Sequence, residues 1–115
     1  MVFQVAGGCG LGALDAADQE GVWGIGVDAD QAFLGPHVLT SALKRVDVAV
    51  FKTIESLVNG DFAGGEVTTF GLADDGVGLG DTSPDAPAEA VEEAKAQIDK
   101  IVAGEIEIPD TVGGR

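Results

Sequence analysis

Two aspartates and a lysine in this sequence each follow directly on an apolar run. Asp28 and Asp30 come after the run 22–27, and Lys44 comes after the run 38–43. A carboxylate accepts hydrogen bonds from sugar hydroxyls and an ammonium donates to them, so these three side chains suit a hydroxylated neutral ligand. The alternative is that both aspartates cap a surface turn and that the lysine is simply solvated.

A glycine-rich turn offers a second kind of ligand contact. The apolar run 2–6 ends at Gly7 and Gly8, and helical spacing of apolar residues begins shortly afterwards. Glycines in such a turn let backbone N–H groups approach a ligand at the N-terminus of a helix. We therefore expect Gly7 and Gly8 to line the same site as Asp28.

The glycine turn also has a rival interpretation. Gly8-x-Gly10-x-x-Ala13 matches the relaxed dinucleotide fingerprint, and Asp28 follows at the spacing expected of a ribose-binding acid. Against this, the predicted helix is short, the doubled glycine is atypical, and glycine-rich turns are common in a chain with 18 glycines. A dinucleotide-dependent oxidoreductase fragment therefore stays open as a second hypothesis.

Hydrophobic periodicity predicts the elements that position these residues. Residues 2–6 and 22–27 are predicted as strands joined by one helix, which makes a parallel βαβ unit with a right-handed crossover. Residues 38–43 are predicted as a third strand. Because the carboxyl ends of parallel strands meet at one edge, Asp28 and the glycine turn are expected there together.

The rest of the chain is predicted from apolar residues at helical or alternating spacing and from glycines that end helices. In chain order we expect a helix whose apolar stripe runs from Val46 to Val58 and ends at Asn59-Gly60, a hairpin of strands 66–72 and 77–79, a linker over 81–88, a helix with a stripe from Val91 to Val102, and a short extended tail over 106–115. This divides the chain into an α/β segment over 1–65 and a second segment over 66–115.

Composition excludes several classes of partner. The net charge is −14, from 20 acidic against 6 basic residues, so nucleic acid is an unfavourable partner. Such an acidic, lysine-poor surface is typical of adaptation to high salt, and the alternative is an ordinary acidic protein. A single cysteine, Cys9, allows neither an intrachain disulfide nor a zinc site. No apolar run is long enough for a membrane span and no signal peptide is evident, so we expect a soluble chain.

Taken together, several segments resemble the basic membrane lipoprotein family, the substrate-binding proteins of ABC importers that include purine nucleoside receptors. The matching segments are Phe3-Gln-Val-Ala-Gly-Gly-Cys-Gly-Leu-Gly12, Ile25-Gly-Val-Asp-Ala-Asp-Gln31, Val38-Leu-Thr-Ser-Ala-Leu-Lys44, Val46-Asp-Val-Ala-Val50 and Gly76-Val-Gly-Leu79. The resemblance implies part of a type I periplasmic-binding fold, with an α/β core, flanking helices and the C-terminal hairpin and helix.

The resemblance also implies a function. Asp28 and Lys44 would hold the ribose of a nucleoside, and Gly7 and Gly8 would line the wall of the cleft. The chain would be the C-terminal third of a receptor that is lipid-anchored on the outer face of the cell membrane. That receptor delivers ligand to a transporter permease, with no cofactor and no chemistry on the ligand. A third hypothesis is a remnant that binds nothing, and exposed apolar faces are candidates for self-association.

Overall fold

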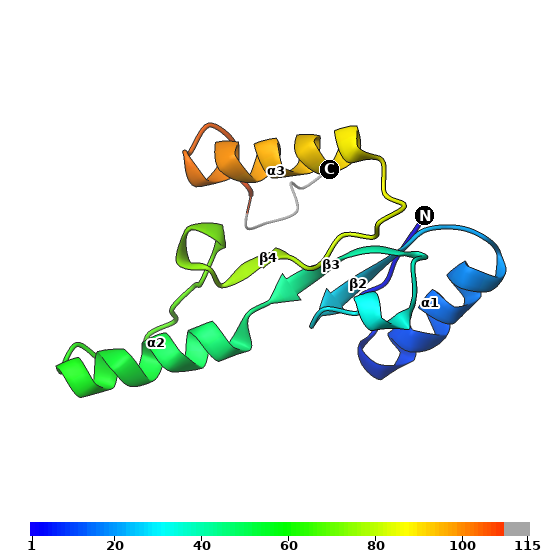
Figure 1. Cartoon of the computed structure of the whole chain (residues 1–115). Helices are drawn as coiled ribbons and strands as arrows, with labels where there is room; N and C mark the ends of the chain where they lie inside the picture. The colour runs from blue at the N-terminus through cyan, green and yellow to red at the C-terminus, as the bar shows by residue number, and fades with distance from the viewer. Residues whose placement is uncertain (110–115) are drawn as a thin grey trace, which may run out of the picture.

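The strands of the computed structural model pair in the order in which they occur along the chain. The structure describes residues 1–109, which form a four-stranded sheet of order β1-β2-β3-β4 with helices around it (Figure 1). The elements are β1 (Val2–Phe3), α1 (Gly10–Gln19), β2 (Gly24–Asp28), β3 (Val38–Lys44), α2 (Val46–Asn59), β4 (Val77–Leu79) and α3 (Ala88–Val102). The predicted α/β class with a parallel core is confirmed.

The first two strands and α1 form the predicted parallel βαβ unit. β1 pairs with β2 in parallel, with Val2 opposite Gly24. The apolar face of α1 buries Leu14 completely, and a side chain at Gly24 would collide with it. β1 is shorter than the predicted strand over 2–6, because the buried Gln4 turns its side chain back to accept a hydrogen bond from the Ala6 N–H at 3.1 Å.

β2 and β3 are also parallel, although the connection between them is short. Asp28 lies opposite Leu43, at the carboxyl ends of both strands. Parallel neighbours usually need a crossover helix of a dozen or more residues. Here residues 29–37 suffice, with one turn of 3-10 helix over Ala32–Leu34. A set of side-chain hydrogen bonds, described below, holds this short connection against the sheet.

The predicted hairpin is wrong. Residues 66–71 form no strand, and the exposed Val67 has no neighbouring strand among the described residues. β4 instead pairs antiparallel with β3, with Ala42 opposite Leu79. The longer β3 would otherwise leave a row of unpaired backbone groups along its edge, and β4 satisfies part of that row. Local alternation in sequence cannot reveal such a distant pairing.

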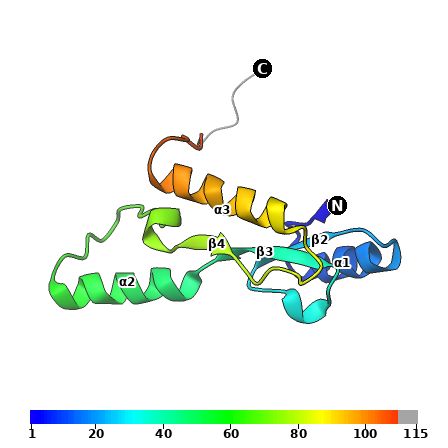
Figure 2. The same cartoon turned by 45° about the horizontal axis from the view of Figure 1, so that its top comes forward.

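The long helix α2 stands away from the sheet (Figures 1 and 2). It ends as predicted, with Gly60 in the left-handed conformation at φ +83°. Its apolar stripe is exposed, by 52% at Val50 and 62% at Leu57. No described element packs along this stripe, so self-association through it stays a prediction.

The second half of the chain is joined to the same sheet. The buried Ser83 donates its hydroxyl to the Pro36 carbonyl at 2.7 Å, and its backbone N–H donates to the Leu39 carbonyl at 2.8 Å. α3 follows and lies over the sheet as the predicted amphipathic helix (Figure 2). The division at residue 65 stays a prediction. Of the predicted tail over 106–115, residues 106–109 form no strand, and the rest lies outside the described residues.

The acidic surface predicts salt-dependent stability. Mutual repulsion of charges on a chain of net charge −14 is screened as the Debye length falls from about 10 Å at 0.1 M salt to about 3 Å at 1 M. Raising KCl over this range is expected to raise Tm by about 5 °C or more, measured by circular dichroism. A Tm that is constant or falls would contradict the halophilic interpretation.

Candidate functional site

The carboxyl ends of β1, β2 and β3 meet at one edge of the sheet, because the three strands are parallel neighbours. Asp28 ends β2 and Lys44 ends β3. The Lys44 Nζ lies 2.7 Å from the Asp28 Oδ1, and the two side chains are 62% and 53% exposed. The structure thus brings together an accessible hydrogen-bond acceptor and an accessible donor, as the spacing in the sequence predicted.

The glycine turn begins at the same edge, just after β1. Gly7 has φ +54° and starts a single 3-10 turn over Gly7–Cys9 that leads directly into α1. Gly7 and Gly8 are exposed, and a Cβ on either would meet no other atom within 4 Å. Their backbone is therefore open to a ligand. Gly10 has a different role, because a Cβ there would overlap the Gln4 side chain.

Asp30 differs from Asp28 in its surroundings. Its Oδ1 accepts hydrogen bonds from the Ala32 N–H at 3.1 Å and the Ser41 hydroxyl at 3.2 Å, and its Oδ2 accepts from the Asp81 N–H at 2.9 Å. The Asp81 bond is the main cause that lowers the pKa of Asp30 from its ordinary value of 3.8. Both oxygens thus accept hydrogen bonds within the chain, which leaves Asp28 as the more accessible acceptor at this edge.

Replacing Asp30 with Asn is expected to destabilise the fold at neutral pH and to flatten its acid denaturation. The pKa of Asp30 is lower in the folded state than in the unfolded state, so the ionised carboxylate stabilises the fold. This contribution to the free energy of unfolding is present above about pH 4 and is lost as the pH falls through the folded-state pKa. At pH 7 the asparagine NH₂ would face a backbone N–H in either orientation of the amide, that of Asp81 or that of Ala32, which costs about 1–2 kcal/mol. Urea unfolding at several pH values measures both effects, with the exposed Asp61→Asn as control.

No motif or spacing in the sequence pointed to three further polar residues at this edge, Gln4, Gln31 and Ser41. Gln31 Oε1 accepts from the Val27 N–H at 3.0 Å and from Gln4 Nε2 at 3.1 Å, and the Gln31 N–H donates to the Ser41 hydroxyl at 2.9 Å. Gln4 interrupts the apolar run 2–6. A polar residue at such a buried position was the one hint available, because buried amides need partners.

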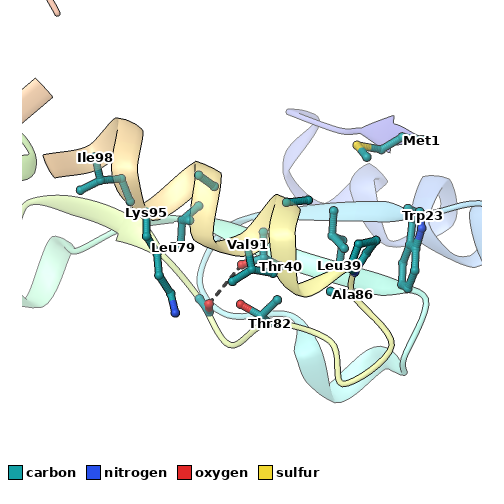
Figure 3. A pocket seen from close by; sticks show the side chains of 14 residues that line it. Met1, Trp23, Leu39, Thr40, Leu79, Thr82, Ala86, Val91, Lys95 and Ile98 are labelled. Carbon is teal, nitrogen blue, oxygen red and sulfur yellow. Dashed lines mark hydrogen bonds between the residues drawn. The ribbon is translucent and has the colours of Figure 1, made fainter. Parts of the chain in front are cut away.

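An apolar cavity lies elsewhere, between α3 and the sheet (Figure 3). It measures about 430 Å³, and Trp23, Leu39, Val91 and Ile98 are among the side chains around it. Trp23 directly precedes β2, at the end of the strand opposite to Asp28, and neither Asp28 nor Lys44 lines the cavity. The candidate ligand edge is therefore separate from this cavity.

Residues 1–109 contain no group of three or more His, Cys, Asp or Glu side chains placed to hold a metal ion. None of the helices in that range is long and apolar enough to cross a membrane.

Comparison with known proteins connects this geometry to a family. A family model described as "ABC transporter substrate-binding protein PnrA-like" matches residues 1–112. The chain belongs to this PnrA-like family. Matches to proteins named basic membrane proteins agree with the resemblance drawn from sequence. Membership in a family of substrate-binding proteins does not favour the dinucleotide alternative.

One PnrA-like relative carries a ligand in its name. The "ABC transporter nucleoside-binding protein BmpA" of Lactococcus lactis is 35% identical over 128 residues, which cover 95% of this chain and 36% of that protein. The chain thus spans about a third of the length of the curated relatives it matches.

Solved structures agree on the fold. A crystal structure described as a transcriptional activator of the comK gene from Bacillus halodurans has a TM-score of 0.83 and 25% identity, over 90% of this chain and 37% of that one. A structure of ABC transporter solute-binding proteins from Aeropyrum pernix K1 has a TM-score of 0.71 and 28% identity, over 95% and 40%. The PnrA-like chain shares its α/β architecture with both.

Proposed function

We propose that the edge formed by Gly7, Gly8, Asp28 and Lys44 binds the sugar hydroxyls of a purine nucleoside or a related sugar-bearing ligand. The exposed Asp28–Lys44 pair carries the proposal, since it places an acceptor and a donor 2.7 Å apart where β2 and β3 end. The open backbone of Gly7 and Gly8 follows β1, the parallel neighbour of β2. Adjacent hydroxyls of a ribose can donate to the carboxylate and accept from the ammonium. The name of the Lactococcus relative supports the choice of nucleoside.

The energetics of the ion pair suit reversible binding. Both partners are more than half exposed, and an ion pair of this kind contributes at most about 1 kcal/mol. A ligand hydroxyl can therefore insert between Asp28 and Lys44 at low cost. The pair keeps both side chains at the edge before ligand arrives, which reduces the ordering cost of binding.

Electrostatics favour a neutral ligand over a phosphorylated one. Asp28 would face any negative charge on the ligand, and the net charge of −14 opposes the approach of anions. The positive charge of Lys44 is balanced by Asp28, so the pair as a whole presents no net positive charge to a phosphate. We infer that the site prefers a nucleoside to the corresponding nucleotide.

The wider role follows from the family. The chain would form part of the ligand cleft of an ABC importer receptor, in which binding is followed by lobe closure and transfer to a permease, without chemistry on the ligand. Anchoring to the outer face of the cell membrane would belong to the longer receptor. These statements extend the proposal from a chain that matches about a third of its relatives' length.

Calorimetric titration tests the proposal. Guanosine, adenosine, guanosine 5′-monophosphate and NAD are titrated into the 115-residue chain at high salt. Binding of a nucleoside, with the monophosphate weaker by about tenfold or more, is the expected result. Tighter binding of NAD would replace the proposal with the dinucleotide alternative. Absence of heat with all four would identify the chain as a module that does not bind by itself.

A further inference from the structure

The backbone at Asp28 adopts a conformation that L-residues rarely take. Its φ is +69°, and Asp75 is the other non-glycine residue with positive φ in the described part of the chain. The Ala29 N–H donates to the Val27 carbonyl at 3.0 Å, which closes a three-residue turn around Asp28. Three-residue turns with positive φ at the centre are rare and strained, and they persist only where surrounding contacts impose them.

The Gln31 side chain binds the turn on its N-terminal side, at the residue before Asp28. Its Oε1 accepts the Val27 N–H at 3.0 Å, so the residue before Asp28 is bound by the residue three positions after it. The same oxygen accepts from Gln4 Nε2 at 3.1 Å. A backbone N–H can only donate, so the bond from Val27 identifies the oxygen end of Gln31.

The residues that follow the turn are bound to β3. The Gln31 N–H donates to the Ser41 hydroxyl at 2.9 Å, and Ser41 is fully buried. Gly26 makes room for the arrangement, because a Cβ there would lie 2.8 Å from the Gln31 Oε1. Residues on both sides of Asp28 are thus fixed by one glutamine, while the Asp28 side chain itself stays exposed.

We propose that Gln31 is the positioning residue of the ligand edge. Its side-chain oxygen holds the turn at Val27, which keeps Asp28 in the left-handed conformation that directs its carboxylate toward Lys44. Gln31 touches no ligand in this arrangement. The part of the inference that concerns affinity rests on the nucleoside proposal above, and the part that concerns the turn stands independently of it.

The test compares two substitutions in the 115-residue chain. Gln31→Met keeps the length of the side chain and removes the acceptor, whereas Gln31→Glu keeps an acceptor for both Val27 and Gln4. NMR follows the intraresidue amide-to-Hα contact of Asp28, which is strong only at positive φ, and the hydrogen exchange of the Val27 amide. Calorimetry follows guanosine affinity.

In the Met variant we expect the strong intraresidue amide-to-Hα NMR contact of Asp28 to be lost. Hydrogen exchange of the Val27 amide should be about tenfold faster, and guanosine should bind about tenfold more weakly. The Glu variant should retain all three properties, as should the control Gln19→Met on the exposed end of α1. If the Met variant does not fold, Gln31→Asn withdraws the same amide by one methylene and is expected to give the same losses.

An Asp28 that keeps its positive φ in the Met variant, or in the Asn variant where the Met variant does not fold, would overturn the inference, whatever happens to affinity. If the unmodified chain fails to bind guanosine, the nucleoside proposal fails. The contact at Asp28 and the exchange at Val27 then decide the role of Gln31 by themselves.

Discussion

Replacing Asp28 with Ala is expected to weaken guanosine binding by about 5- to 150-fold, the equivalent of 1–3 kcal/mol for a lost charge-assisted hydrogen bond. The carboxylate is the exposed acceptor of the ligand edge, and Lys44 cannot substitute for it because an ammonium only donates. Titration calorimetry at high salt measures the change. Affinity equal to that of the unmodified chain would reject the assignment of Asp28.

The chain offers a matched control for this substitution. Asp75 is also an aspartate with positive φ, at +60°, but it lies in the turn before β4 and not at the ligand edge. Asp75→Ala therefore carries a similar backbone penalty and should leave guanosine affinity unchanged. Asp28→Asn separates the two contributions further, because asparagine tolerates the left-handed region and lacks only the charge.

Replacing Leu14 with Ala is expected to lower the free energy of unfolding by about 2–5 kcal/mol, a large share of the 5–15 kcal/mol typical of a domain. Leu14 is completely buried and packs where Gly24 leaves no side chain. The described core contains few such residues, so the substitution removes a large part of its buried apolar surface. Urea denaturation followed by circular dichroism measures the loss.

Leu11→Ala is the control on the same helix, because Leu11 is 49% exposed. It is expected to change the unfolding free energy by about 0.5 kcal/mol or less. Equal effects at Leu11 and Leu14 would contradict the orientation of α1 against β2. Since α1 begins directly after the glycine turn, a fold weakened at Leu14 should also bind ligand less well.

The described residues form only a small apolar core. Leu14, Ala17 and Val38 are the buried hydrophobic residues among those described, whereas most large apolar side chains of α2 are exposed. The chain corresponds to about a third of the length of its relatives. Stability of the isolated chain therefore depends on a few apolar contacts and on the hydrogen bonds that join the turn after β2 to β3.

The sequence by itself determined the elements whose signals are local. Periodicity and glycine stops predicted α1, α2 and α3, and apolar runs predicted β2 and β3. The prediction that Asp28 and the glycine turn share an edge also follows from sequence, because two strands joined by a crossover helix run parallel and therefore end on the same side. These properties depend on residues near one another in the chain or on a rule of topology.

Tertiary structure decided which polar groups meet. Asp28 and Asp30 are alike in sequence, yet Asp30 accepts the backbone N–H of Asp81 while Asp28 faces solvent. The pairing of β4 with β3 and the contact between Gln4 and Gln31 likewise join distant segments. A hydrogen bond needs its donor and acceptor within about 3 Å, and no local pattern of hydrophobicity encodes that distance.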